Sequence, residues 1–323
     1  MRKAWSALLL GLTLAVPLHA ADNGFSIAIL APLNDAMLGR AIAETDDANL
    51  AFVVVNGIKP AEAECSDEVY LERKILLDSA KNGLIISLAG SDWTTCRNAE
   101  GQSIAIARLT RLRDLFFIDE FSFGASKLPL VRQSGTPKFR SYAENAHWEI
   151  GAIQFATINL PANNNHFLAA AGRNSEYEDR QIANHAWLQR LIANATYRKL
   201  TALVLFCDGD LLTPKKQSPH RDGFAQLRSQ LKQLATSYPG RILLVHDRAE
   251  TNSETTGTIS WSGNVGALAV GTNWLRLTFK PDGPELFSVS HGGRSNGTSG
   301  GTSGGPSNSK NTGGNKKAAV TTK

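Results

Sequence analysis

The chain has 323 residues, three cysteines and a formal net charge of +5. Seven basic residues and no acidic residue lie in residues 1–20 and 291–323, so the body between these ends carries a charge near −2. A body with nearly balanced charge offers no basic face, and nucleic-acid binding is therefore excluded as an expected function.

The first twenty residues predict a secretory signal peptide. Arg2 and Lys3 form its charged start, an apolar run extends from Leu8 to Val16, and Leu18-His19-Ala20 forms an A-x-A-like end before the expected cleavage. This run is shorter than the roughly 20 apolar residues that span a bilayer, and no later segment is apolar enough to do so. We therefore expect a periplasmic or secreted protein. The alternative is a buried N-terminal helix.

Between residues 25 and 245, short apolar runs alternate with segments of helical periodicity, an order typical of an α/β fold. The runs share a β-branched, apolar composition typical of strands covered on both faces. We predict six such strands: Phe25–Leu30, Leu50–Val55, Leu84–Leu88, Ala152–Ile158, Thr201–Phe206 and Ile242–Val245. After Asp247, shorter extended runs predict antiparallel strands at Thr258–Trp261, Ala267–Val270, Leu275–Phe279 and Leu286–Val289.

Four helices are predicted between the strands. Ser66 is expected to cap the first, whose first turn carries Asp67 and Glu68, where acidic residues favour the helix dipole. The other three are marked by apolar residues at near-helical spacing. These are Ile104, Leu109, Leu112 and Phe116; Ile182, Leu188, Leu191 and Ala195; and Phe224, Leu227, Leu231 and Leu234.

Three cysteines in an exported protein predict one disulfide and one remaining thiol. Cys65 and Cys96 each follow one of two successive strands, at matching positions in the loops, and we expect them to pair. Cys207 ends an apolar strand and is expected to be a buried thiol rather than a nucleophile. No Cys-x-x-Cys spacing predicts zinc or redox chemistry.

The end of the chain, residues 291–323, consists mainly of Gly, Ser, Asn, Thr and Lys. Such a composition has almost nothing to bury and predicts a disordered tail. The tail is interpreted as a solvated segment, with a tether toward anionic envelope polymers as the alternative. The folded domain is accordingly predicted to span residues 21–290, after a signal peptide at residues 1–20.

Residues 51–96 resemble the secreted bacterial branch of the calcineurin-like metallophosphoesterase superfamily. The resemblance implies Gly-Asp-Ile-Lys after one strand, then Cys-Ser-Asp, then Gly-Asp-Asn-Glu-Trp after the next strand and a final Thr-Asp-Cys. The corresponding residues are Asn56, Gly57, Ile58 and Lys59; Cys65, Ser66 and Asp67; Ala89, Gly90, Ser91, Asp92 and Trp93; and Thr94, Thr95 and Cys96. Weaker similarities extend the resemblance, with gaps, from Phe25 to Val289. It implies a layered α/β/β/α sandwich.

The resemblance also implies a binuclear metal centre, but expected ligand positions carry other residues. These positions hold Leu30, Gly57, Ser91 and Glu250. Residues of the scaffold, such as Trp93 and Trp187, match the family pattern. The sequence therefore predicts a phosphoesterase fold that is degenerate at its metal ligands, and no catalytic residue is assigned.

Ligands of open α/β sheets bind outside the carboxyl ends of the strands. The candidate crevice residues at these ends are Asn56, Ser91, Asp92, Asn164, Asn165, His166, His246 and Glu250. Weak candidates for a metal are Asp35, Asp92, Asp208, Asp210, His246 and Asp247. Plain structural roles compete with these assignments: Asp35 suits the start of a helix, the Asn-rich turn suits a conformational role, and His246 suits a structural hydrogen bond.

Three functions remain open. The leading hypothesis is an exported binding or interaction module without the standard metal centre or any cofactor, whose partner is an envelope component or a phosphate-containing small molecule. The alternative is an active metal-dependent phosphoesterase with a reduced or rearranged site, using Mn²⁺ or Mg²⁺ held by carboxylates. The third is a structural envelope protein that contacts anionic polymers through its basic tail. The chain has no nucleophile elbow, P-loop or dinucleotide fingerprint.

Overall fold

The computed structural model describes residues 24–31, 33–168, 174–214, 221–247, 256–271, 274–281 and 283–292, all within one compact unit. The predicted signal peptide, Glu250 and the tail beyond Gly292 lie outside the described residues. No helix in the described ranges is both long and apolar enough to cross a membrane.

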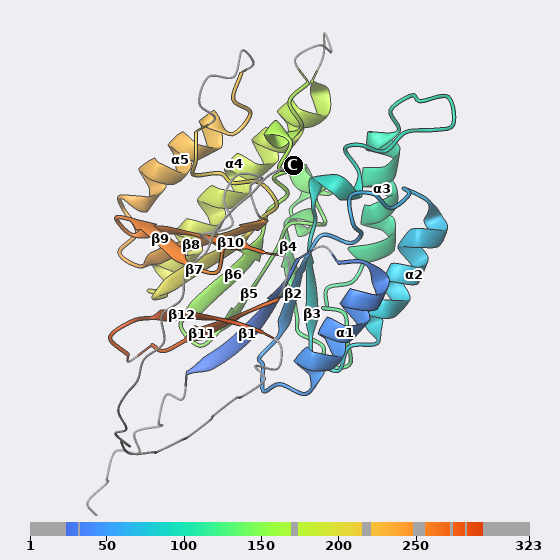
Figure 1. Cartoon of the computed structure of the whole chain (residues 1–323). Coiled ribbons are helices and arrows are strands. Elements are labelled where there is room, and N and C mark those ends of the chain that lie inside the picture. Colours follow the sequence, from blue (N-terminus) through green and yellow to red (C-terminus); the bar gives the residue numbers. More distant parts are fainter. Residues whose placement is uncertain are drawn as a thin grey trace, which may run out of the picture. The chain divides into compact units, whose positions relative to one another are not determined.

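The fold is built on two mixed β-sheets (Figure 1). The first has the strand order β12-β11-β1-β2-β3, in which β1, β2 and β3 run parallel and β11 and β12 are antiparallel additions. Its strands are β1 (Phe25–Leu30), β2 (Val53–Asn56), β3 (Leu84–Ser87), β11 (Leu275–Phe279) and β12 (Phe287–His291).

The second sheet has the order β4-β5-β6-β7-β8-β10-β9. Its central strands, β6, β7, β8 and β10, run parallel. At the two edges, β4, β5 and β9 are antiparallel to their neighbours. Its strands are β4 (Val131–Arg132), β5 (Ala146–Ile150), β6 (Ile153–Thr157), β7 (Ala202–Phe206), β8 (Arg241–Asp247), β9 (Ile259–Ser262) and β10 (Val265–Val270).

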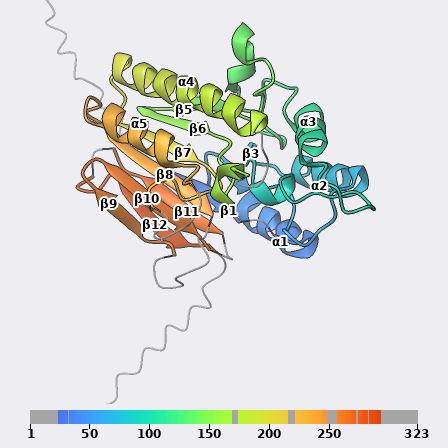
Figure 2. The ribbon, with the colours of Figure 1, turned by 90° about the horizontal axis from the view of Figure 1, so that it is seen from above.

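Helices cover the outer face of each sheet (Figure 2). The first sheet packs against α1 (Asp35–Asp46), α2 (Asp67–Asp78) and α3 (Ala105–Phe116), and the second against α4 (Ser175–Tyr197) and α5 (Ala225–Ala235). Short single turns complete the described chain: η1 (Gly90–Asp92), η2 (Gln133–Gly135), η3 (Pro137–Phe139) and η4 (Asn164–His166). The predicted α/β/β/α sandwich is confirmed.

The core between the sheets follows the two-residue period of the strands. Ile27 and Val54 of the first sheet belong to the same buried cluster as Phe155, Phe206 and Val245 of the second. Aromatic rings pack against one another between the two sheets. The ring centroids of Phe52 and Phe155, for example, lie 4.9 Å apart. The same alternation determines which side chains face the opposite sheet at the strand ends.

Every predicted strand is observed within a few residues of its expected bounds, and the four predicted helices are confirmed as α2 to α5. Ser66 caps α2 by accepting a hydrogen bond from the Val69 amide. One assignment is wrong: Ile182 was expected on the buried face of α4 but is 55% exposed. The helix instead packs through Ala183, Trp187 and Leu191.

The prediction that the chain ends in antiparallel strands is confirmed only in part, since β10 runs antiparallel to β9 but parallel to β8. Strands β4 and β5 were not expected. In β5, Ala146 and Trp148 are buried while His147 and Glu149 are partly exposed, so the strand lacks the continuous apolar run of a doubly covered strand. The disulfide between Cys65 and Cys96 is confirmed, and Cys207 is a buried free thiol.

Candidate functional site

Strands β2 and β3 end in polar side chains that face the second sheet. Val54 and Ile85 belong to the core between the sheets, and Asn56 and Ser87, two residues further along each strand, therefore share that face. Asn56 and Ser87 are opposite each other in the parallel ladder and are only 3% and 1% exposed. Neither the Asn56 amide nor the Ser87 hydroxyl has a hydrogen-bond partner among the described residues.

Asp92 fixes the loop that follows β2. Its Oδ1 accepts hydrogen bonds from the amides of Ile58 and Lys59 at 2.9 and 3.1 Å, and its Oδ2 accepts one from the Ala89 amide at 2.9 Å. Burial raises the pKa of Asp92 to about 6, although these amides and the Lys59 charge act in the opposite direction. The arrangement makes Asp92 a positioning residue for two loops.

The Asp208 carboxylate also holds two loops in place, one from each sheet. Its Oδ2 accepts from the amides of Gly90, after β3, and Ala162, after β6, both at 2.7 Å. A Cβ atom on Gly90 would lie 3.1 Å from this oxygen and 3.0 Å from the Pro161 Cβ, so the close approach favours glycine. Burial raises the pKa of Asp208 despite the two amide donors.

His246 lies near both Asp208 and Asp210 and interacts electrostatically with each carboxylate. Oδ1 of Asp210 accepts from the amides of Leu212 and Thr213, an ordinary turn contact. Burial acts to raise the pKa of Asp210, but hydrogen bonds from Thr213 and the nearby His246 lower it overall. The Nδ1 atom of His246 lies 2.6 Å from the carbonyl oxygen of the next residue.

Asp35 is 72% exposed on its side chain and begins α1. Asn34 caps this helix by accepting from the Met37 amide, and Asp35 forms an ion pair with Arg73 at 3.0 Å. Asp35 therefore lies at the start of a helix, the structural role that the sequence also suggested for it. Ser91, the residue at the expected Asn-ligand position, lies in the single turn η1 and is partly exposed.

The Asn-rich turn after β6 has an unusual backbone. Asn164, Asn165 and His166 all have positive φ angles, of 55°, 54° and 53°. Non-glycine residues pay a conformational cost in this region, and such residues cluster at functional sites. Arg180 holds the turn by donating to the side chain and carbonyl of Asn165, and His166 packs on Trp93 with ring centroids 4.8 Å apart.

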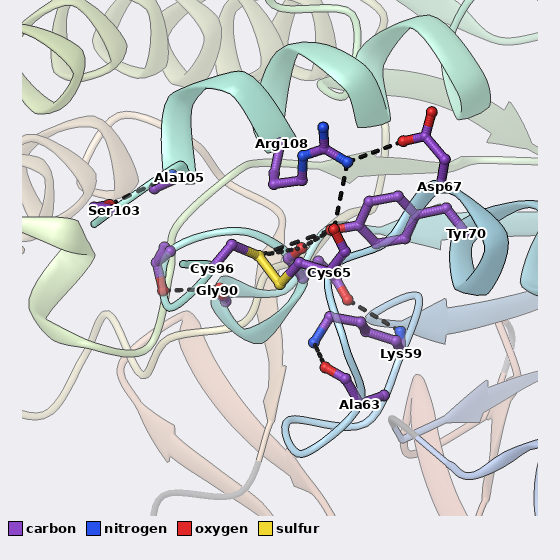
Figure 3. Close-up of a disulfide and its surroundings, with 12 residues drawn as sticks. Lys59, Ala63, Cys65, Asp67, Tyr70, Gly90, Cys96, Ser103, Ala105 and Arg108 are labelled. Atoms are coloured by element: carbon purple, nitrogen blue, oxygen red, sulfur yellow. Dashed lines mark hydrogen bonds and ion pairs between the residues drawn. A yellow bond between two sulfur atoms is a disulfide. The ribbon is translucent and has the colours of Figure 1, made fainter. Parts of the chain in front are cut away.

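A disulfide lies among the loops that follow β2 and β3 (Figure 3). Cys65 and Cys96 join the loop between β2 and α2 to the loop after β3. Lys59 donates through Nζ to the Ala63 carbonyl at 2.7 Å (Figure 3). The Tyr70 hydroxyl donates to the Asp92 carbonyl at 2.8 Å. The loops that flank Asn56 and Ser87 are thus tied to each other covalently and by buried hydrogen bonds.

A binuclear metal centre does not fit the described residues. They contain no group of three or more His, Cys, Asp or Glu side chains that could hold a metal ion. Leu30 and Gly57 offer no ligand atom in their side chains, and the carboxylates of Asp92 and Asp208 accept hydrogen bonds from the backbone. Glu250 lies outside the described residues.

Buried polar atoms without a partner concentrate at this edge of the molecule. Among the described residues, six of twelve such atoms belong to the ends of β2 and β3 or to the loops after β3 and β6. The six are Asn56 Nδ2 and Oδ1, Ser87 Oγ, Trp93 Nε1, Asn159 Oδ1 and His166 Nδ1.

The larger of two pockets in the described part of the chain lies elsewhere. The larger, about 270 Å³, is lined by residues of α2, the end of α3 and the segment that follows it, including Ile118 and Phe123. Phe123 bridges to Leu84 at the start of β3, so this pocket lies at the opposite end of that strand from Ser87.

Sequence reasoning placed Asn56, Asn165 and His166 in this region but missed Ser87 and Asn159. Ser87 is the last residue of the apolar run Leu84–Ser87, and the two-residue period from Ile85 could have assigned it to the inner face. No comparable pattern marks Asn159, whose amide donates to Glu144 Oε1 at 2.9 Å.

No family model and no curated protein matches the chain. Among solved structures it is similar to a "Putative 5'-Nucleotidase from Staphylococcus aureus in complex with alpha-ketoglutarate", with 11% sequence identity and a TM-score of 0.43. The match covers 84% of this chain and 53% of that chain, so this protein spans about half the length of its structural neighbour.

Proposed function

We propose that this protein is an exported binding protein with a metallophosphoesterase-like fold, which holds a small molecule at the carboxyl ends of its two sheets and lacks the standard binuclear metal centre. The observation that carries this proposal is the concentration of buried, partnerless polar atoms at that edge. Each such group costs free energy when no partner compensates it, so a bound molecule that supplies hydrogen-bond partners is favoured at that edge.

The state of the buried carboxylates supports binding over hydrolysis. A two-metal hydrolase uses its carboxylates to hold the ions that activate water. Here the Asp92 carboxylate accepts hydrogen bonds from three backbone amides, and Oδ2 of Asp208 accepts them from two. Both carboxylates therefore hold loops in place. The neighbouring Asn56 and Ser87 are neutral, and their side-chain polar atoms have no hydrogen-bond partner in the part of the chain that the structure describes.

The family and location rest on the sequence motifs. The strand-end motifs around Cys65 and Cys96, together with the α/β/β/α order, support a fold of the phosphoesterase type. A disulfide is typical of proteins in oxidising compartments, and it agrees with the signal peptide predicted at residues 1–20.

The test is metal content and turnover of the full chain after export. Purified protein is challenged with Mn²⁺ or Zn²⁺, its metal content is measured by mass spectrometry, and hydrolysis of bis(p-nitrophenyl) phosphate is followed. We expect no stoichiometric metal and no metal-dependent turnover. A pair of ions per chain, with turnover lost in Asp208→Ala and kept in the distant control Asp119→Ala, overturns the proposal. A single ion with the same pattern of turnover favours a rearranged hydrolase.

A further inference from the structure

A pocket of about 270 Å³ lies where α2 and α3 end, at the opposite end of β3 from Ser87. This volume is just below the roughly 300–1,000 Å³ of small-molecule sites. Phe116, at the end of α3, and Phe123 line the pocket, and their ring centroids lie 6.0 Å apart. None of its lining residues belongs to the strand ends described above, so the pocket is a separate place where a small molecule could bind.

Apolar side chains of this pocket remain open to solvent. Ile118 is 74% exposed and Phe121 is 53% exposed, and both line the pocket. Phe116, by contrast, is almost fully buried. Water gains no hydrogen bonds from these side chains, so an apolar group that displaces water from them is bound favourably.

The pocket wall also carries two positive and two negative side chains. Lys74 and Asp78 are four residues apart on α2 and therefore share one face of that helix. Lys127 forms an exposed ion pair with Asp78 at 3.7 Å, whereas Lys74 forms none with any residue in the described part of the chain. The fourth group, Asp119, interacts electrostatically with the buried guanidinium of Arg132. The four formal charges of the wall thus cancel, but they lie at separate positions.

This mixture favours a ligand that itself carries both signs of charge. A carboxylate on the ligand can pair with Lys74 and Lys127, and an ammonium group on the ligand can pair with Asp78. The carboxyl ends of α2 and α3 add partial negative charge, which also attracts an ammonium group. A ligand with a single charge is attracted by one sign on the wall and repelled by the other, so it gains less from the same residues.

We propose that this pocket binds a small zwitterion with an apolar side chain, namely a free amino acid such as leucine or phenylalanine. The ligand carboxylate faces Lys74 and Lys127, its ammonium group faces Asp78, and its side chain covers Phe121 and Ile118. This inference goes beyond the proposed function and does not rest on it, because the two sites share no residue.

The first experiment measures binding to the full chain by saturation-transfer NMR titration. Leucine and phenylalanine are compared with three other compounds. Glycine is a zwitterion without an apolar side chain, N-acetylphenylalanine lacks the ammonium group, and phenylalaninamide lacks the carboxylate. We expect leucine or phenylalanine to bind, and each comparison compound to bind about tenfold more weakly or less, because it has lost a charge-assisted contact or the apolar group. Binding of neither amino acid, or equal binding of any comparison compound, overturns the proposal.

The second experiment tests whether the amino acid binds in this pocket. Lys74→Met and Asp78→Asn each remove one charge at similar side-chain volume, and Ile118→Ser removes an exposed apolar group. Each should weaken binding by about tenfold. The matched controls are Lys232→Met on α5 and Ile182→Ser on α4, which remove an exposed lysine and an exposed isoleucine from helices of the second sheet. Both controls should bind the amino acid as wild type does.

The outcomes separate this inference from the proposed function. Undiminished binding in either Lys74→Met or Asp78→Asn, at an unchanged melting temperature, assigns the amino acid to another place and overturns the inference. Two metal ions per chain with phosphodiester turnover overturn the proposed function, while amino-acid binding that depends on Lys74 and Asp78 still stands.

Discussion

The Gly90 amide donates to Oδ2 of Asp208 over 2.7 Å, and this contact joins a loop of the first sheet to a strand end of the second. The same oxygen accepts from the Ala162 amide after β6. One buried carboxylate therefore holds three segments together at the edge where Asn56 and Ser87 lie. The geometry of that edge depends on Asp208 as an acceptor more than on its charge.

Asp208→Ala should lower the free energy of unfolding by about 2–5 kcal/mol, because it leaves two buried amides without an acceptor. Asp208→Asn keeps an oxygen in reach of both amides and should cost clearly less. Urea denaturation measures both. Asp210→Ala serves as the control, since it also removes an acceptor of two amides but in a local turn. Equal losses for Asp208→Ala and Asp210→Ala would contradict the bridging role.

Asp92 should make the protein less stable as pH rises. Its folded-state pKa of about 6 lies above the ordinary value of 3.8, so between these values the folded state binds more protons than the unfolded state. Stability therefore falls across this window by about 3 kcal/mol and is then constant. Urea denaturation at a series of pH values should show this slope in wild type and its absence in Asp92→Asn. An unchanged slope in the variant would assign it to another group.

Glu144 should act in the opposite direction. Burial acts to raise its pKa, but the Arg113 guanidinium, which donates to Oε1 at 2.6 Å and to Oε2 at 2.9 Å, and the Asn159 amide lower it overall. A depressed pKa contributes stability that is present above the unfolded-state value and is lost as pH falls through the folded-state value.

Glu144→Gln should accordingly cost about 3–5 kcal/mol near neutral pH, because it leaves the partly buried Arg113 without its counter-ion. The loss should shrink as the solution is made acidic enough to protonate Glu144 in wild type. The same pH series checks this result. A loss that stays constant down to low pH would show that the ion pair is not its source.

The disulfide should stabilise the loops of the candidate site. It closes a sequence separation of 31 residues, which corresponds to about 3–4 kcal/mol in the chain-entropy description. The double variant Cys65→Ser with Cys96→Ser should lose this amount in urea denaturation. Cys207→Ala, at a buried free thiol, is the control and should leave a reductant-sensitive transition, whereas the double variant should unfold identically with and without reductant.

The sequence predicted the central strands well because they are covered on both faces and therefore consist of continuous apolar runs, as in Ala202–Phe206. It missed β5 because only alternate residues of that strand are buried. The pairing of Cys65 with Cys96 was predictable from their matching loop positions.

The roles of the site residues were less accessible from the sequence. Asp92 and Asp208 looked like metal candidates because a carboxylate after a strand suits both a metal and a loop. The difference depends on which amides converge on each oxygen, and those amides belong to Ile58 and Ala162, residues far away in the chain. Sequence periodicity identifies the face of a side chain, but not its long-range partners.

A final prediction concerns the end of α4, away from the site. Lys199 follows the C-cap residue Arg198 with a φ angle of 53°, and the next amide, of Leu200, donates to the Ala195 carbonyl at 2.9 Å. This arrangement is typical of a helix end that favours glycine at the position of Lys199, because a Cβ atom is strained at positive φ. Lys199→Gly should raise the free energy of unfolding by about 1 kcal/mol.

Lys199→Ala is the matched control, since it removes the same exposed side chain but retains the Cβ atom. Urea denaturation should show no comparable gain for this variant. A gain shared by both variants would indicate that the lysine side chain, and not the backbone conformation, is unfavourable. A gain confined to glycine assigns the cost to the left-handed backbone, the same conformation that Asn164, Asn165 and His166 adopt beside the candidate site.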